Sequence, residues 1–215
     1  MIIDMHVHTQ VSDDSWVTPE TYLNWVNILR KNHDISGLAF TEHRKVDSKT
    51  DFDKLAREYE VVIFRGIELD TDCGHFLVFG PLEEIEKKIN PDNVNTNAVD
   101  LMSLVDELGG IALPAHPGRK NVGFFYHLDS GRDFSNVKIV ESLNGSSKAA
   151  ENELAEKLAA EKDYFRIGGS DAHFVSDLCS CLTRFDNPFS DWEELVSELK
   201  AGKYSPIRLK DANKR

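Results

Sequence analysis

Short apolar segments rich in Ile, Val and Phe alternate along the chain with longer segments in which apolar residues recur at helical spacing. This alternation is typical of repeated βα units that build a mainly parallel sheet. The pattern predicts strands over residues 2–8, 37–41, 61–69, 75–79, 111–115, 137–143 and 165–169. The clearest helices are predicted over residues 18–32, 97–108, 147–162 and 191–201.

Start and stop signals support the predicted helices. Thr18 before Pro19 has the sequence of an N-cap followed by Pro at the first helical position, and Gly109 and Gly110 follow the second predicted helix. Residues 90–97, with four Asn and one Pro, are expected to form a loop. Neither a linker nor a repeat divides the chain, so we predict a single α/β domain over residues 1–215.

Composition and charge narrow the class of protein. The chain has 215 residues, of which 40% are hydrophobic and 29% charged, as in an ordinary globular protein. These values exclude disordered, collagen-like and coiled-coil proteins. The formal net charge is −12 with eight His counted as neutral, which argues against long nucleic acid bound through its phosphates.

The chain shows no sign of membrane insertion or export. No stretch reaches 18 consecutive apolar residues, and the first residues lack the charged and apolar regions of a signal peptide. The cysteines, Cys73, Cys179 and Cys181, are odd in number and are expected to be reduced thiols. We therefore expect a cytoplasmic protein without membrane contact.

The first predicted strand carries candidate metal ligands. Side chains alternate between the faces of a strand, so Asp4, His6 and His8 are expected on one face, with Met5 and Val7 on the other. Two imidazoles two residues apart would thus point to the same place. This is a metal-binding arrangement.

Similar residues recur where the other predicted strands end. Residues 168–173 repeat the spacing, with Asp171 and His173 two apart. Further candidates at strand ends are Glu42, His43, Glu68 and His116. Asp13 in the loop after the first strand and His75 at the start of its strand complete the set. Barrel-like βα folds place their chemistry at the carboxyl ends of their strands, so these residues are expected to share one site. Imidazole and carboxylate ligands without a Cys cluster indicate divalent metals, and exclude a structural zinc knuckle.

The order of these motifs resembles the PHP (polymerase and histidinol phosphatase) family of metal-dependent phosphoesterases. The matching segments are residues 4–9 with 12–13, 41–43, 66–68, 75, 115–117 and 169–173. The resemblance implies a distorted (βα)7 TIM-like barrel that holds up to three divalent ions, Zn, Mn or Fe. One ion would use His6, His8, Glu68 and Asp171, a second Glu68, His75 and His116, and a third Asp13, His43 and His173.

Two positions depart from the family pattern. Glu42 stands where the family more often has Asp, and Asp14 stands where it more often has Gly. Neither change removes a ligand. Asp14 would either add a carboxylate near the metal or face water, and we expect it to face water. Asp4 and Glu42 are candidate acceptors for the second ring nitrogens of the ligand His residues.

The resemblance implies a hydrolase that cleaves a small phosphomonoester or nucleotide by metal-bound hydroxide at a trinuclear site. His43 or His173 is a candidate proton donor to the leaving alkoxide. Arg44 and Arg119 are candidate phosphate clamps, because guanidinium pairs bidentately with phosphate oxygens. The roles of Glu141, Asn144, Arg184 and residues 124–126 stay open. Residues 124–126 would either stack a substrate ring or pack beneath a loop.

Two other functions stay open at this point. An amidohydrolase-type enzyme also has an HxH motif on its first strand, but it usually carries a bridging Lys on a middle strand, where this chain has Glu68. A non-catalytic metal-binding module of the same family would dock on a partner protein. Such modules tend to lose ligands, whereas all nine positions are filled here.

Overall fold

The computed structural model describes residues 1–213 and has a mixed α/β architecture. One sheet curls through seven strands in the order β5-β4-β3-β2-β1-β8-β9, and β6 and β7 form a separate parallel pair. The strands are β1 (Ile2–Val7), β2 (Gly37–His43), β3 (Val62–Thr71), β4 (Gly74–Phe79), β5 (Ile111–Pro114), β6 (Ile139–Asn144), β7 (Phe165–Gly169), β8 (Cys181–Phe185) and β9 (Tyr204–Arg208).

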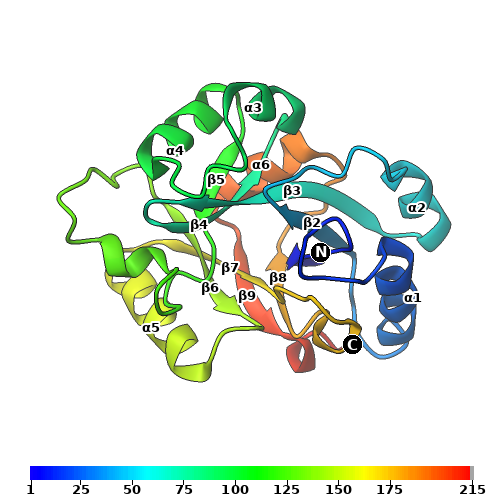
Figure 1. The fold of residues 1–215 in the computed structure, drawn as a ribbon. Coiled ribbons are helices and arrows are strands. Elements are labelled where there is room, and N and C mark those ends of the chain that lie inside the picture. Colours follow the sequence, from blue (N-terminus) through cyan, green and yellow to red (C-terminus); the bar gives the residue numbers. More distant parts are fainter. Residues whose placement is uncertain (214–215) are drawn as a thin grey trace.

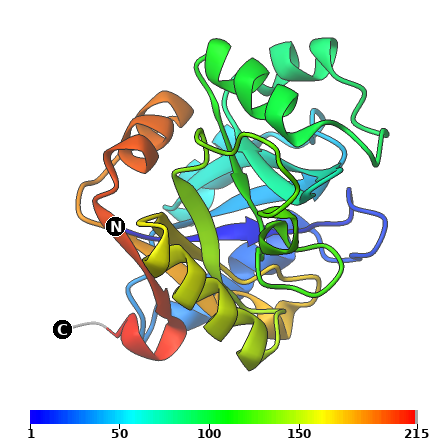
Figure 2. The same cartoon turned by 90° about the vertical axis from the view of Figure 1, so that its left-hand side faces the viewer.

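Helices surround these strands on the outside of the molecule (Figures 1 and 2). They are α1 (Pro19–Leu29), α2 (Phe52–Tyr59), α3 (Leu82–Lys88), α4 (Ala98–Glu107), α5 (Ala149–Glu161) and α6 (Trp192–Ala201), with short 3-10 turns η1 (Phe124–His127), η2 (Val175–Asp177) and η3 (Leu209–Asp211). Within residues 1–213, none of the helices is both long and apolar enough to pass through a membrane.

Local sequence explains where the helices begin. The Thr18 hydroxyl accepts a hydrogen bond from the Thr21 backbone N–H at 3.2 Å, and Pro19 occupies the first helical position, as predicted. In the same helix Tyr22, Leu23 and Val26 are buried against the sheet. The Asn97 side chain caps α4 in the same way.

All seven predicted strands are present, and their ends differ from the predicted ends by no more than two residues. The regular βα alternation is interrupted, however, because β3 and β4, and likewise β8 and β9, are antiparallel neighbours. The turn between β3 and β4 is too short to hold a crossover helix, and Gly74 at its end has φ of 100°. The helices α2 and α3 and the hairpin of β8 and β9 were not predicted.

The end of β7 lies beside the end of β1. The Asp171 N–H donates to the His6 carbonyl oxygen at 2.7 Å, and the His8 N–H donates to the Ala172 carbonyl oxygen at 3.0 Å. Val7 and Ala172 form a parallel bridge at the same place. Residues from the two ends of the sequence therefore meet at one position in the fold.

The first strand does not follow simple alternation of side chains. Its pairing with β2 shifts between Asp4 and Val7. As a result Met5 and Val7, which were expected on one face, belong to different buried clusters, Met5 with Leu113 and Ile139, and Val7 with residues of α1. The expected common face for these two residues is therefore wrong, although both are fully buried.

Candidate metal centre

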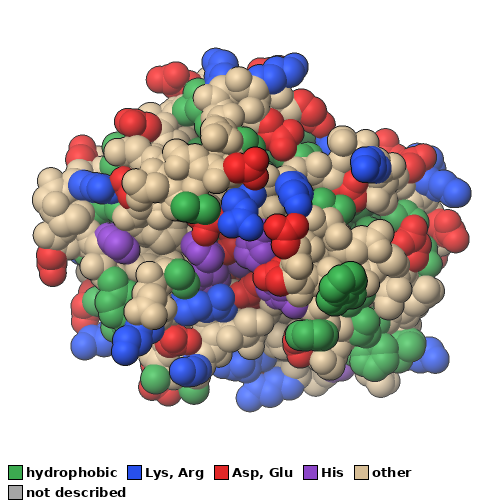
Figure 3. Space-filling view, in the orientation of Figure 1, with side chains coloured by type: hydrophobic (Ala, Val, Ile, Leu, Met, Phe, Trp, Pro, Cys, Tyr) green, Lys and Arg blue, Asp and Glu red, His purple; other side chains and the backbone are tan. Residues whose placement is uncertain are grey.

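Eight of the nine predicted ligands converge where the strands end, and His side chains gather in a hollow of this face (Figure 3). The described residues contain three overlapping groups of side chains whose donor atoms lie within 4.8 Å of one another. The groups are His6, His8, Glu68 and Asp171; then Glu68, His75 and His116; and then His8, His43 and His173.

The strand directions explain how His75 joins the cluster from the beginning of its strand. Because β4 runs antiparallel to β3, the start of β4 lies beside the end of β3, and His75 pairs in register with Asp70. Its Nδ1 lies 3.1 Å from Glu68 Oε1. His116, directly beyond β5, places its Nε2 3.0 Å from the same oxygen.

The first group has the geometry of a cation site. Nε2 of His6 and Nε2 of His8 are 2.9 Å apart, and Glu68 Oε2 lies 3.1 and 3.2 Å from them. Oδ1 of Asp171 lies 3.5 and 3.3 Å from the same two nitrogens. All four side chains are buried. Two imidazoles and two carboxylates directed at one point are ligands that suit a divalent ion.

The charged groups of this cluster shift one another's pKa values. Burial alone would raise the pKa of Glu68, but His6, His116 and His75 hold it well below its usual range. Burial would lower the pKa of His8, yet its contacts with Asp171 and Glu68 raise it to about 9. The cluster therefore keeps its carboxylates ionised.

Asp14, rather than Asp13, lies beside the third group. Oδ2 of Asp14 lies 3.4 Å from His43 Nε2 and 3.2 Å from His173 Nε2. The Asp13 side chain is 71% exposed and pairs instead with Lys45 Nζ at 2.8 Å. Asp13 therefore lies outside the donor groups, whereas Asp14 reaches both histidines while 55% of its side chain stays exposed to water, as expected. The turn after β1 directs the second of these two carboxylates toward the two histidines.

Glu141 on β6 orients two of the histidines. Its Oε1 lies 3.0 Å from His6 Nδ1, and its Oε2 accepts hydrogen bonds from the His116 backbone N–H at 2.8 Å and from the Asn144 amide at 2.9 Å. Asn144 also donates to Asp171 at 3.3 Å. These two residues, whose roles the sequence left open, fix the positions of ligand side chains.

The candidate acceptors Asp4 and Glu42 act on the backbone and loops rather than on ring nitrogens. Asp4 accepts hydrogen bonds from the backbone N–H groups of Ser170 and Cys179, both at 2.8 Å. Glu42 accepts from the Thr9 and Ser12 hydroxyls, both at 2.6 Å. The two carboxylates therefore anchor the loops that carry the ligands.

The candidate phosphate clamps lie at the border of the cluster. Arg119 places Nη2 2.7 Å from Asp171 Oδ2 and also contacts the Asn144 side chain at 2.8 Å. Arg44 pairs with Asp70 at 3.2 Å. Asp70 was missed by the sequence reasoning, although it also lies 3.1 Å from Nε2 of His75.

Backbone strain collects at the same place. Among the non-glycine residues with positive φ are Arg44 at 54°, His116 at 29° and Asp171 at 54°, which directly follow β2 or lie just beyond β5 and β7. L residues rarely adopt this conformation, and it persists where the surrounding structure imposes it. At Asp171 and His116 the residue so held carries a donor atom of the cluster.

The other residues whose roles the sequence left open, apart from Tyr126, lie away from the donor groups or in the core. Phe124 and Phe125 are buried in the core, so this part of the 124–126 segment packs beneath the loop, while Tyr126 is exposed. Arg184 on β8 pairs in register with Ile2, at the start of β1 and therefore away from the cluster.

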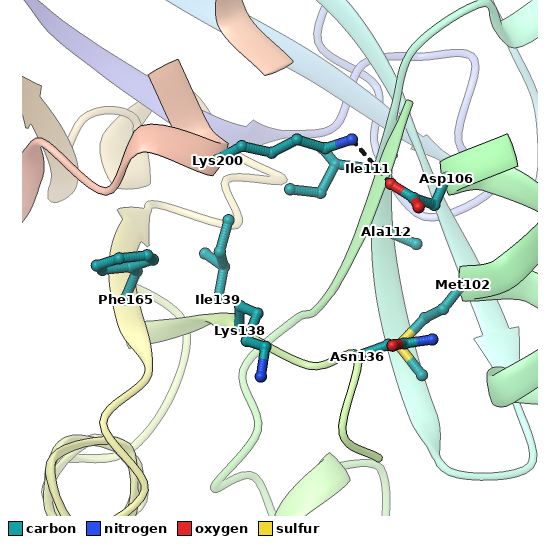
Figure 4. Close-up of a pocket in the computed structure, with 9 residues that line it drawn as sticks. All are labelled: Met102, Asp106, Ile111, Ala112, Asn136, Lys138, Ile139, Phe165 and Lys200. Atoms are coloured by element: carbon teal, nitrogen blue, oxygen red, sulfur yellow. Dashed lines mark hydrogen bonds and ion pairs between the residues drawn. The ribbon is translucent and has the colours of Figure 1, made fainter. Parts of the chain in front are cut away.

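A pocket of about 360 Å³ lies at the end of the sheet opposite the donor groups, where β5, β6 and β7 begin (Figure 4).

Comparisons with known proteins agree with this picture. A family model described as PHP-associated matches residues 149–204. An uncharacterized protein of Methanocaldococcus jannaschii is 28% identical over 123 residues, which are 54% of this chain and 68% of that protein.

Solved structures share the fold at low identity. PsfC from Pseudomonas syringae has a TM-score of 0.70 at 19% identity, covering 96% of this chain and 91% of that one. A putative metal-dependent phosphoesterase from Bifidobacterium adolescentis has a TM-score of 0.59 at 15% identity, covering 80% and 87%. The lesion-specific endonuclease Q from Pyrococcus furiosus has a TM-score of 0.67 at 14% identity, covering 96% and 58%.

The chain shares its curled α/β fold with these structures, and its strand ends carry a cluster of His, Asp and Glu side chains that could hold metal ions. These matches support the resemblance to the PHP domain family, whose motifs the chain carries in order from residue 4 to residue 173. The mixed α/β class is confirmed, and the matches support the predicted family.

Proposed function

We propose that the protein is a phosphoesterase that hydrolyses a small phosphomonoester or nucleotide with the help of up to three divalent ions, Zn, Mn or Fe. The observation that carries the proposal is the convergence of three overlapping donor groups in one hollow. Bound divalent ions would lower the pKa of water and neutralise charge on a phosphate. The donor set fits such ions, since it combines imidazole nitrogens with ionised carboxylates.

Each donor group would hold one ion. His6, His8, Glu68 and Asp171 form the first site. The second site consists of His75, His116 and the other oxygen of Glu68. For the third site we propose His43, His173 and Asp14, in place of Asp13.

The cationic side chains at the border would bind the substrate phosphate. Arg119 contacts Asp171, Asn144 and Ser147, and Arg44 contacts Asp70, while their side chains remain 25% and 31% exposed. Both are placed beside a ligand, at Asp171 and His43. Guanidinium groups in such positions can turn toward phosphate oxygens that enter the hollow.

We propose that His43 and His173 act mainly as metal ligands and only secondarily as proton donors. Both ring nitrogens of His43 face carboxylates, Glu68 and Asp14. In His173 one nitrogen faces Asp14 and the other lies 3.0 Å from the Asp171 carbonyl oxygen. A proton for the leaving alkoxide would then be delivered by one of these rings only while it is not bound to metal.

Nucleic acid stays within the range of substrates to be tested. One endonuclease Q structure holds a 27-mer duplex with an abasic lesion at its active site. That chain is 16% identical to this one, so the likeness supports the fold alone. The net charge of −12 favours small anionic substrates over long strands.

We also propose that β1 to β7 form one distorted seven-stranded barrel within a single domain of residues 1–215. The parallel bridge between Val7 and Ala172 supports closure between β7 and β1. The hydrogen bond from the His116 N–H to Glu141 supports closure between the ends of β5 and β6. The expected cytoplasmic location stays a proposal.

The test is hydrolysis by purified protein reconstituted with Mn, Fe or Zn. We expect phosphate release from at least one member of a broad phosphoester panel, and loss of at least 100-fold of this activity in His6→Ala with an unchanged circular dichroism spectrum. Failure of the wild type on every member, with metal bound, would overturn the proposal. It would favour the non-catalytic module that docks on a partner.

The amidohydrolase alternative is tested by the same preparation. The position where such enzymes carry a bridging Lys is occupied by Glu68, whose two oxygens face different donor groups. Cleavage of amides and lactones without cleavage of phosphoesters would favour that alternative.

A further inference from the structure

Two aromatic residues that follow proposed metal ligands in the sequence have side chains exposed to solvent. Trp16 is 88% exposed and Phe174 is 61% exposed, the highest values among the large hydrophobic residues described in residues 1–213. Aromatic side chains of this size are usually buried for most of their surface. Exposed aromatic residues on loops that border a site can form a surface that binds a ligand.

Both residues are next to ligands of the third donor group. Trp16 follows Asp14 by two positions, and Phe174 directly follows His173. The Ser15 hydroxyl lies 3.2 Å from the His173 carbonyl oxygen, and Asp14 Oδ2 lies 3.2 Å from His173 Nε2. The two loops are therefore joined to each other at the edge of the hollow. Hydrophobic side chains border the His side chains on this face (Figure 3).

Buried hydrogen bonds hold these loops in place. Glu42 accepts from both Thr9 and Ser12 in the loop that leads to Trp16. In the other loop the Tyr22 hydroxyl donates to the Ala172 carbonyl oxygen at 3.0 Å. The backbone that carries the two aromatic residues is therefore held in place. Binding of a ligand to them would cost little conformational entropy, because the loops are already ordered.

Cations lie on the same face of the site. Lys45 pairs with Asp13, which precedes Asp14, and Arg44 lies 3.7 Å from the same carboxylate. A ligand at this edge would meet aromatic faces, donor groups for metal and positive side chains. Among small phosphoesters, a nucleotide carries the matching parts, a planar base and a phosphate.

We propose that Trp16 and Phe174 form a stacking surface for the base of a nucleotide substrate. This inference rests on the proposed phosphoesterase function and narrows its substrate class. Stacking on aromatic rings accepts every base, because each base has a π-face. The surface would therefore select nucleotides over sugar phosphates without selecting one base.

The test compares adenosine 5′- and 3′-monophosphate with ribose 5-phosphate, which lacks the base. We expect kcat/KM of the wild type to be at least tenfold higher for one of the nucleotides. In Trp16→Ala and in Phe174→Ala this ratio should fall at least fivefold through a higher KM for the nucleotide, and Trp16→Phe should restore most of it. Ile28→Ala, which removes an exposed apolar side chain on α1, is the matched control and should keep the wild-type ratio.

The outcomes separate the two proposals. A wild-type ratio near one, or variants that keep the wild-type ratio, would overturn the stacking surface and leave the phosphoesterase proposal intact. The second outcome would favour a protein-docking role for the aromatic pair. If none of the three compounds is hydrolysed, calorimetric titration of the metal-loaded protein with the same compounds decides. Nucleotide affinity that exceeds ribose 5-phosphate affinity tenfold and falls in Trp16→Ala supports the inference, and equal affinities overturn it.

Discussion

At the scale of single residues, the turn after β1 decides which of two neighbouring carboxylates faces the histidines. Asp13 and Asp14 are adjacent and chemically identical, yet one pairs with Lys45 at the surface and the other faces His43 and His173. Sequence alone could not separate them, because the direction of each side chain depends on the backbone of the turn. The histidines were easier to assign, since their positions at strand ends already brought them together.

The pair of aspartates gives a matched experiment. Asp14→Ala should lower phosphate release at least tenfold and reduce the bound metal per chain, because it removes a carboxylate from the third donor group. Asp13→Ala removes only a surface ion pair and should stay within twofold of the wild type. Metal content by mass spectrometry and initial rates check both. Equal losses in the two variants would contradict the assignment of Asp14.

At the scale of elements, the contact between β7 and β1 constrains the site closely. A Cβ atom at Gly169 would lie 2.5 Å from Cβ of His6 and 2.6 Å from Oε1 of Glu141. Both contacts are shorter than real side chains allow. The strand that ends in the Asp171 motif can therefore approach the first strand only because this residue has no side chain.

Gly169→Ala should accordingly destabilise the protein by about 2–3 kcal/mol, the upper part of the range for overpacking. Gly131→Ala is the control. There φ is 78° and nothing lies within 4 Å of the added Cβ, so only the backbone cost of about 1 kcal/mol applies. Urea unfolding followed by circular dichroism measures both. A smaller loss in Gly169→Ala than in Gly131→Ala would contradict the argument.

The elements also show what the sequence could reveal and what it could not. The seven strands have apolar runs flanked by turn residues, and these local signals sufficed to find them. Strand direction depends on tertiary pairing, so the antiparallel placement of β4 and the hairpin of β8 and β9 were not predictable from periodicity. The contact of Asp70 with His75 depends on the same antiparallel pairing of β3 and β4, and the contacts of Glu141 with the cluster depend on neighbours distant in sequence.

At the scale of the whole molecule, bound divalent ions would offset part of the negative net charge of the chain. Three divalent ions would bring the formal net charge from −12 to about −6. Ions that bind only the folded chain stabilise it by about 3 kcal/mol at a hundredfold excess over Kd. Adding Mn to chelator-treated protein should therefore raise Tm by about 5–10 °C at this chain length. Differential scanning fluorimetry measures the shift, and His6→Ala should reduce it at least by half.

Glu68 divides its two oxygens between donor groups, Oε2 toward His6 and His8 and Oε1 toward His75 and His116. Ions in the first two groups would therefore share one ligand, and their affinities would be thermodynamically linked. Whatever factor the first ion contributes to binding of the second, the second contributes equally to the first. Filling the two sites in either order must then give the same product of binding constants, so the pair is characterised by its coupling and not by two separate affinities.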